Sequence, residues 1–255
     1  MKTTGNTRVG KTLGAIAALA TMLAGPAFAA DLPTYVYEEP VYDKAGAWYL
    51  RGDIGYVATR DYSVTYEGSA GHQEFYHEDF ADTWLFGVGI GYQFNHWFRA
   101  DVTLDYRATL DFEGKTICAS SCGSEIYNSE FGSFSMIALL GNAYLDWDND
   151  SKFTPYIGAG LGFAYIFNDR QYAHNVDNSF NSFHANGQVN FAAAAMAGVS
   201  VDVGHNWAID ANYRYLWVGD IDSGGPEFNA PTTGTVTYND VDFHEVRVGA
   251  RYTFH

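Results

Sequence analysis

The sequence predicts an all-β fold, an eight-stranded antiparallel transmembrane β-barrel of the outer membrane. Three observations lead to this fold class. Segments of about ten residues alternate apolar and polar side chains, short turns alternate with long polar connections, and aromatic residues recur at the turns. After residue 30, polar residues interrupt every apolar run, so no segment is typical of a membrane helix. A membrane-spanning sheet must close, because an open edge would expose unpaired backbone groups to lipid.

Residues 1–29 are predicted to form a signal peptide. A basic start is followed by an apolar run over 13–23 and by Ala27-Phe28-Ala29, an order typical of a secretory leader. The apolar run is too short for an anchoring helix, which needs about 20 residues. Residues 30–47 are expected to be an extended periplasmic lead-in. Without the 3 basic residues of the leader, 30 acidic residues face 11 basic ones, which argues against nucleic acid as a partner.

The barrel domain is predicted over 48–255, with four long external loops. Its first strand extends from Trp48 to about Val57 and places Tyr49, Arg51 and Asp53 on the inward face. The acidic connection 58–82 follows. Its segment 62–66 still alternates, which leaves open that the first strand continues above the membrane.

The second and third strands, over 84–94 and 98–107, carry the most weight in this prediction. The second places Gly87, Gly89 and Gly91 opposite a row of bulky apolar residues, and these glycines are expected to make room for large side chains in a narrow lumen. The inward face of the third strand holds Arg99, Asp101, Thr103, Asp105 and Arg107. Four charges on one face, opposite an unbroken apolar face, do not fit a soluble core.

Five further strands follow, over 134–147, 153–165 and 191–203, from Trp207 onwards, and over 243–254. The first of these directs Asn142 and Asp146 inward, and long connections are expected over 108–132, 167–190 and 219–240. The last strand directs inward Glu245, Arg247, Gly249, Arg251 and Thr253, and outward Val246, Val248, Ala250, Tyr252 and Phe254. A soluble lipocalin-type barrel would have the opposite polarity, with its apolar face inward.

Cys118 and Cys122 lie in the second long connection and are expected to form a disulfide. An even number of closely spaced cysteines in an exported chain is typical of a disulfide. Zinc would require further ligands with suitable spacing, and a thioredoxin-like motif has two intervening residues instead of three.

Three segments carry a resemblance to a known family. They are Ala-Ala-Asp-Leu-Pro over 29–33, Thr-Pro-Tyr-Ile-Gly-Ala-Gly-Leu-Gly over 154–162, and Arg-Val-Gly-Ala-Arg-Tyr-Thr-Phe over 247–254. From Trp48 onwards the chain resembles the small porin-like outer-membrane proteins of alphaproteobacteria, which are related to the opacity-type eight-stranded barrels. The resemblance implies an abundant surface protein linked to envelope integrity, host contact and, in some members, haemin binding. Such chains usually end on an aromatic residue, whereas His255 follows Phe254 here.

The inward faces together define the candidate site, a network of charges of both signs. Its members are Arg51, Asp53, Arg99, Asp101, Asp105, Asp210, Arg214, Glu245, Arg247 and Arg251. An eight-stranded barrel is about wide enough for side chains to fill. The favoured interpretation is therefore a buried ion-pair network that closes the lumen. The alternative is a narrow conduction path lined by these charges.

Other kinds of site have weaker support in the sequence. No histidine is followed two residues later by serine, and Gly-x-Ser-x-Gly does not occur, so no catalytic residue is assigned. The acidic loops lack a calcium motif and are interpreted as solvated surface, so no metal site and no cofactor is assigned. The family resemblance raises haemin ligation by His72, His77, His174 and His184 as an alternative to ordinary exposed histidines.

We therefore expect a structural outer-membrane barrel that supports envelope integrity, displays surface loops and is not an enzyme. A small channel for ions or solutes is the first alternative, and a receptor for haemin or a host ligand is the second. The expected partners are outer-membrane lipid, lipopolysaccharide, and the barrel-assembly machinery, which would read the C-terminal strand. The protein is expected to be a monomer.

Overall fold

The computed structural model describes residues 45–60, 64–68, 71–74, 76–117, 127–147, 149, 151–168, 171–174, 180–183, 186–222 and 234–254. The predicted signal peptide, almost all of the predicted lead-in, the cysteine pair and His255 lie outside these residues. Within them, no helix is long and apolar enough to cross a membrane.

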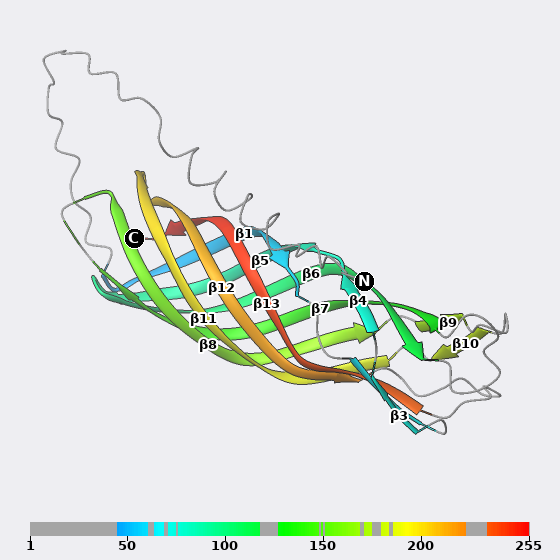
Figure 1. Cartoon of the computed structure of the whole chain (residues 1–255). Coiled ribbons are helices and arrows are strands. Elements are labelled where there is room, and N and C mark those ends of the chain that lie inside the picture. Colours follow the sequence, from blue (N-terminus) through cyan, green and yellow to red (C-terminus); the bar gives the residue numbers. More distant parts are fainter. Residues whose placement is uncertain are drawn as a thin grey trace, which may run out of the picture. The chain divides into compact units, whose positions relative to one another are not determined.

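Eight long strands form a closed antiparallel barrel, which confirms the predicted fold class (Figure 1). They are β1 (Ala47–Ala58), β5 (Thr83–Asn95), β6 (Phe98–Ile117), β7 (Tyr127–Asp146), β8 (Phe153–Asn168), β11 (Asn186–Gly204), β12 (Trp207–Asp222) and β13 (Gly234–Thr253). Each strand pairs with the next in this order, and β13 pairs with β1 from Thr253 opposite Tyr49 to His244 opposite Ala58. Because the ring closes, none of the eight long strands forms an open edge along the barrel.

The two ends of the barrel differ in their connections. Short connections join β5 to β6, β7 to β8 and β11 to β12, and we call this the turn end; the opposite end is the loop end. Five short strands belong to the loop end: β2 (Val64–Gly68), β3 (Gly71–Glu74), β4 (Tyr76–Phe80), β9 (Gln171–His174) and β10 (Phe180–Phe183). β1 and β2 both pair with β13, and β2 does so beyond the end of β1. The first barrel strand therefore continues towards the loop end as a second, separate segment.

The long connections predicted over 108–132, 167–190 and 219–240 are wrong in extent. β6 continues to Ile117, β7 begins at Tyr127, β11 begins at Asn186, β12 continues to Asp222 and β13 begins at Gly234. On β6 and β12 the reason is that the loop-end segment still alternates, but with inverted polarity. On β6, Leu110 and Phe112 are buried, whereas Asp111 and Glu113 are exposed.

A bulge accompanies this inversion on β6. The pairing of β6 with β7 shifts between Arg107 and Leu110, so the inward position moves from odd-numbered to even-numbered residues. Val102, Leu104 and Tyr106, on the turn-end side of the bulge, have exposed apolar side chains. The outer surface of the strand therefore changes from apolar to acidic at the bulge, as expected where a barrel wall passes from lipid into water.

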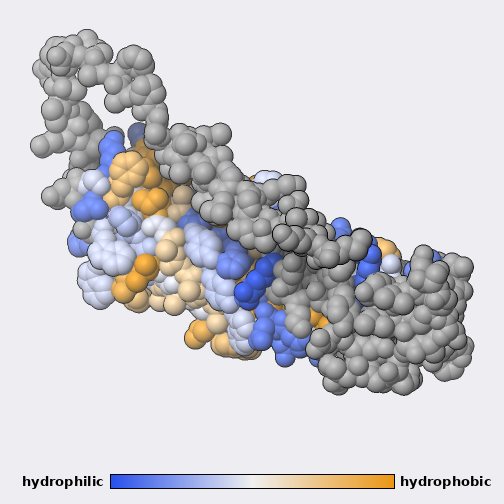
Figure 2. Space-filling model, viewed as in Figure 1, coloured by the Kyte–Doolittle hydropathy of each residue, from blue (hydrophilic) through white to orange (hydrophobic). Residues whose placement is uncertain are grey.

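The outer surface along the rest of the barrel is apolar and aromatic. Trp48, Trp97, Trp147, Phe153, Trp207 and Phe254 surround the turn end, each between 45% and 57% exposed. Figure 2 shows pale and orange residues over the strands on one side, while strongly hydrophilic residues gather towards the ends of the strands. Such a ring of aromatic side chains is typical of the boundary between lipid and water.

Candidate functional site

The candidate site is the interior of the barrel, where alternation on β1, β6, β7, β12 and β13 directs ion-paired side chains inward. All ten predicted residues lie on the inner face. Nine of them are at most 8% exposed, and the side chain of Arg251, near the turn end, is 11% exposed. Because the side chains are held on closed strands, the register of the barrel decides which charges meet.

Three arginines and two acids form the part of the network that is closest to the loop end. Glu245 accepts hydrogen bonds from Arg107 Nε at 2.7 Å through Oε1 and from Arg214 Nε at 2.6 Å through Oε2. Asp105 likewise uses both oxygens: Oδ2 accepts from Arg214 Nη1 at 2.8 Å, and Oδ1 accepts from Arg247 Nη2 at 2.7 Å. All four of these carboxylate oxygens are thus engaged by buried guanidinium groups, as a buried charge requires.

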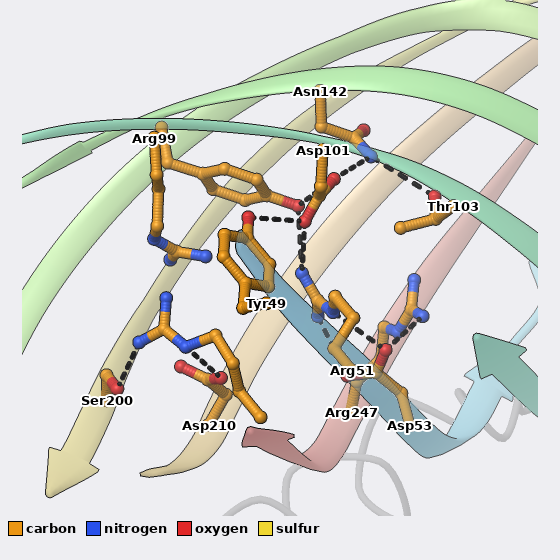
Figure 3. Close-up of polar contacts among 12 residues, drawn as sticks. Tyr49, Arg51, Asp53, Arg99, Asp101, Thr103, Asn142, Ser200, Asp210 and Arg247 are labelled. Atoms are coloured by element: carbon orange, nitrogen blue, oxygen red, sulfur yellow. Dashed lines mark hydrogen bonds and ion pairs between the residues drawn. The ribbon is translucent and has the colours of Figure 1, made fainter. Parts of the chain in front are cut away.

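Arg247 and Arg51 continue the network towards the turn end through Asp53 (Figure 3). Arg247 Nη2 lies 3.2 Å from Asp53 Oδ2, and Arg51 binds the same carboxylate with two atoms, at 3.0 and 2.8 Å. Arg51 Nη1 also donates to Asp101 Oδ2 at 3.2 Å. An unbroken series of ion pairs therefore connects Arg107 at one end with Asp101 at the other.

Asp101 is also held by neutral side chains. Asn142 Nδ2 donates to its Oδ1 at 2.8 Å, and the hydroxyls of Tyr49 and Tyr144 donate at 3.1 and 3.3 Å (Figure 3). These contacts satisfy a carboxylate that has a single arginine partner.

Two separate ion pairs lie nearer the turn end. Arg99 Nε is 3.0 Å from both oxygens of Asp146, and its guanidinium carbon lies 4.0 and 4.5 Å from the ring centres of Tyr144 and Tyr156. Cation–π contacts therefore stabilise a cation that is fully buried. Arg251 pairs with Asp210 at 3.6 Å and donates to Ser200 at 2.9 Å.

Two interior charges, Arg107 and Asp146, were missing from the candidate list, although alternation had already directed both inward. With them, the described ion-paired network holds six arginines and six carboxylates. Their formal charges cancel, so the formal charge of −16 on the whole chain belongs to residues outside the network. A balanced interior is what a low-dielectric lumen requires.

Inward glycines stand beside the largest polar side chains of the network. Gly87 pairs with Asp53 on β1 and with Asp105 on β6, and Gly91 pairs with Tyr49 and Asp101. A Cβ atom at Gly87 would lie 2.3 Å from Asp105 Oδ1, and one at Gly91 would lie 2.3 Å from Cζ of Tyr49. The glycines therefore leave the space that neighbouring charged and aromatic side chains fill.

Beyond the network, towards the loop end, each of the eight barrel strands contributes at least one fully buried apolar side chain. One from each strand is 0% exposed, and we call these the apolar layer: Val57, Leu85, Leu110, Met136, Ile166, Ala192, Leu216 and Phe243. They belong to one continuous cluster of buried residues. Phe243 lies directly against the network, with its ring centre 5.8 Å from the guanidinium carbon of Arg107. Sequence reasoning missed this layer because six of its members stand singly on predicted strands, whereas Leu110 lies in a predicted connection and Ile166 just beyond a predicted strand, and only the closed barrel brings them together.

The loop-end rim of the outer surface carries a second set of polar contacts. Tyr56 donates to Asp82 at 2.6 Å, and Asp242 accepts from Tyr215 at 2.7 Å and pairs with Arg60. Tyrosine hydroxyls on an otherwise apolar wall are typical of the membrane boundary.

The haem-ligand alternative rests on four loop histidines, of which only His174 has a described side chain, and it is exposed. The side chains of His72, His77 and His184, and the whole of Cys118 and Cys122, lie outside the described part of the chain. The predicted disulfide therefore stays a prediction.

Comparison with known proteins agrees with this architecture. The family described as "Outer membrane protein beta-barrel domain" matches residues 15–254. An uncharacterized protein of Brucella abortus (strain 2308) is 31% identical over 291 residues, covering 93% of this chain and 98% of that protein. Opacity protein opA66 of Neisseria gonorrhoeae is 24% identical over 244 residues, covering 81% and 96%.

Among solved structures, the outer membrane protein OprG from Pseudomonas aeruginosa superposes with a TM-score of 0.55 at 15% identity. The match covers 84% of this chain and 98% of that one, and at this identity it concerns the fold alone. Because the family model spans residues 15–254 and agrees with the closed eight-stranded barrel, the chain belongs to the outer membrane protein β-barrel domain family and is a protein of the outer membrane.

Proposed function

We propose that this protein is a closed structural barrel that supports the outer membrane and displays its loop-end segments for interaction at the cell surface. In this orientation the turn end faces the periplasm and the loop end faces outward, as the short and long connections of outer-membrane barrels do. The balanced ion pairs stabilise the interior, and the loop-end strands extend the wall above the membrane.

The apolar layer is the observation that carries this proposal. Its eight side chains come from all eight barrel strands, and none of them has any exposed surface. A channel needs a continuous polar path, and a ring of apolar side chains with no room for water interrupts such a path. The layer therefore favours closure over the alternative of a small channel lined by the inward arginines and aspartates.

Conductance in a planar lipid bilayer tests the proposal. The refolded protein, whose folding is checked by its heat-modifiable shift on a gel, is expected to produce no discrete current steps. Steps whose size follows the salt concentration would instead make the protein a channel, and the interior charges would then be its selectivity lining.

Two partners fit within the same proposal. The strand β13 closes the barrel against β1, and the backbone N–H of Phe254 donates to the carbonyl of Trp48 at 2.8 Å, so it is the strand that we assign to recognition by the barrel-assembly machinery. The tyrosines of the loop-end rim, such as Tyr56 and Tyr215, would lie at the level of lipopolysaccharide headgroups.

A further inference from the structure

The outer wall of the barrel is indented where its first and last strands meet. A groove of about 450 Å³ lies there, and residues of β1, β12 and β13 line it: Leu50, Arg51, Gly52, Trp207, Ala250 and Tyr252. The side chain of Arg51 belongs to the ion-pair network inside the barrel, so the other five residues form the surface of the groove. The groove is therefore apolar, and it opens on the wall that faces lipid.

The small size of two paired residues explains the groove. Gly52 on β1 lies directly opposite Ala250 on β13, and both belong to the outer face. The next outward pair towards the turn end is Leu50 with Tyr252, and Trp207 of β12 also pairs with Tyr252. A Cβ atom at Gly52 would have its nearest neighbour 3.9 Å away, so the space above this pair is open. Large side chains thus border a floor made of two small residues.

The groove starts at the level of the lipid headgroups. Trp207 belongs to the aromatic side chains that surround the turn end, and its ring centre lies 5.0 Å from that of Tyr252. Such a ring of aromatic side chains marks the boundary between lipid and water. The pair of Gly52 and Ala250 is one outward position further from the turn end, on the hydrocarbon side of this boundary. An acyl chain whose headgroup lies at the aromatic ring would therefore pass over this pair.

Two polar atoms at the border of the groove make no hydrogen bond within the described part of the chain. They are the hydroxyl oxygen of Tyr252 and the indole nitrogen Nε1 of Trp207. Tyrosine and tryptophan at a membrane boundary place an apolar body in lipid and a polar tip among hydrogen-bonding groups. The ester and phosphate oxygens of a glycerophospholipid are acceptors at the same depth. These two donors therefore favour a lipid with a glycerophosphate group over a plain hydrocarbon.

We propose that the groove binds one glycerophospholipid of the leaflet at the turn end. One acyl chain lies over Gly52 and Ala250, and the glycerol and phosphate oxygens accept hydrogen bonds from Tyr252 and Trp207. A flexible chain can follow the floor of the groove, whereas the wall of a second barrel would rest on Leu50 and Trp207, which are 47% and 46% exposed. The inference goes beyond the proposed function, and only the assignment of this leaflet to the periplasmic side uses the orientation given there.

The first test fills the groove with the variant Gly52→Leu/Ala250→Leu. Native mass spectrometry of the refolded protein in detergent, titrated with phosphatidylethanolamine, should show a complex of the unchanged protein with one lipid. The folded variant should bind about tenfold more weakly, the loss expected when about two CH₂ groups lose their apolar contacts. The matched control Gly141→Leu/Ala159→Leu also changes one glycine and one alanine on the outer face of neighbouring strands, and it is expected to bind like the unchanged protein.

The second test leaves the floor of the groove unchanged. One equivalent of phosphatidylethanolamine brominated on an acyl chain should quench the tryptophan fluorescence of the protein in detergent, because bromine quenches at contact. Trp207→Phe should remove the larger part of this quenching. The matched control Trp97→Phe, in the same aromatic ring at the turn end, should leave the quenching as it is. This measurement decides the question if the groove-filling variant fails to fold.

Three outcomes would overturn the phospholipid site. The first is equal lipid binding by the unchanged protein and the folded groove-filling variant, and the second is an equal loss of quenching in the two tryptophan variants. The third is a dimer of the unchanged protein that the groove-filling variant does not form, which would identify the occupant as a second copy of the chain. The closure of the lumen is tested separately by the conductance measurement, so the two proposals can fail independently.

Discussion

Gly87 illustrates at the scale of one residue how backbone space and interior charge depend on each other. A Cβ atom there would lie 2.3 Å from Asp105 Oδ1 and 2.5 Å from Arg247 Nη2, which are themselves joined by an ion pair. Neither group can withdraw freely, because both are buried among other charges. The glycine is thus required by its neighbours on the adjacent strands.

We expect Gly87→Ala to destabilise the barrel by about 1–3 kcal/mol, the usual cost of adding atoms to a packed interior. Equilibrium unfolding in lipid vesicles measures this change. Gly52→Ala is the matched control: Gly52 lies on the outer face, and the nearest atom to its Cβ would be 3.9 Å away, so a change within about 0.5 kcal/mol is expected. Equal stability of the two variants would contradict the assigned role of Gly87.

Arg214 forms ion pairs with two carboxylates, so its loss leaves both of them without one of their partners. Replacing it by methionine leaves Glu245 and Asp105 each with one partner fewer in a fully buried setting. Breaking a buried pair in this way costs about 3–5 kcal/mol, and the same unfolding measurement should show a loss of that size. The exposed Lys152 gives a comparison; Lys152→Met should change stability by less than about 0.5 kcal/mol. A small effect at Arg214 would mean that the network contributes little.

At the scale of one element, β6 combines two opposite patterns. Before its bulge the strand is charged inside and apolar outside, and after it the strand is apolar inside and acidic outside. The turn-end half of β6 therefore has the polarity of a membrane barrel, with its apolar face outward. The loop-end half has the polarity of a lipocalin-type barrel, with its apolar face inward.

This change of surroundings can be located by placing a charge on the outer face of β6. Leu104→Arg is expected to cost about 2–4 kcal/mol, as a charge facing lipid near the midplane does, whereas Glu113→Arg should cost about 0–1 kcal/mol because its surroundings are aqueous. Unfolding in vesicles compares them. Similar costs at both positions would place the membrane boundary elsewhere on the strand.

The connection between β6 and β7 gives a further prediction at this scale. The two strands pair from Phe98 opposite Leu145 to Ile117 opposite Tyr127, so their ladder does not depend on the predicted Cys118–Cys122 disulfide. Reduction should therefore leave the heat-modifiable gel shift of the barrel unchanged. Loss of the shift on reduction would show that the disulfide has a role in the barrel wall.

At the scale of the whole barrel, closure separates three environments. The outer wall meets lipid, the loop-end wall meets water, and the interior meets neither in bulk, so its six arginines and six carboxylates must balance one another. The apolar layer then divides the interior into a charged half and an apolar half. Envelope support and surface display both follow from a wall that is continuous and an interior that is closed.

The sequence by itself determined the fold class and the face of each membrane-facing strand. Side chains alternate with period two along any strand, so a run of charges opposite a run of apolar residues identifies the inner and outer faces without knowledge of the neighbours. Ten of the twelve interior charges were recognised in this way, and the other two were already on inward positions.

Only the tertiary structure decided which charges pair and where the interior is apolar. Arg247 meets Asp53 across 194 positions of sequence, and that contact depends on the register at which β13 closes on β1. The loop-end halves of the strands were hidden for a different reason. Their outward residues are polar because they face water, so the same alternation that identified membrane strands was read there as loop. Register and depth in the membrane belong to the closed barrel, and no single segment contains them.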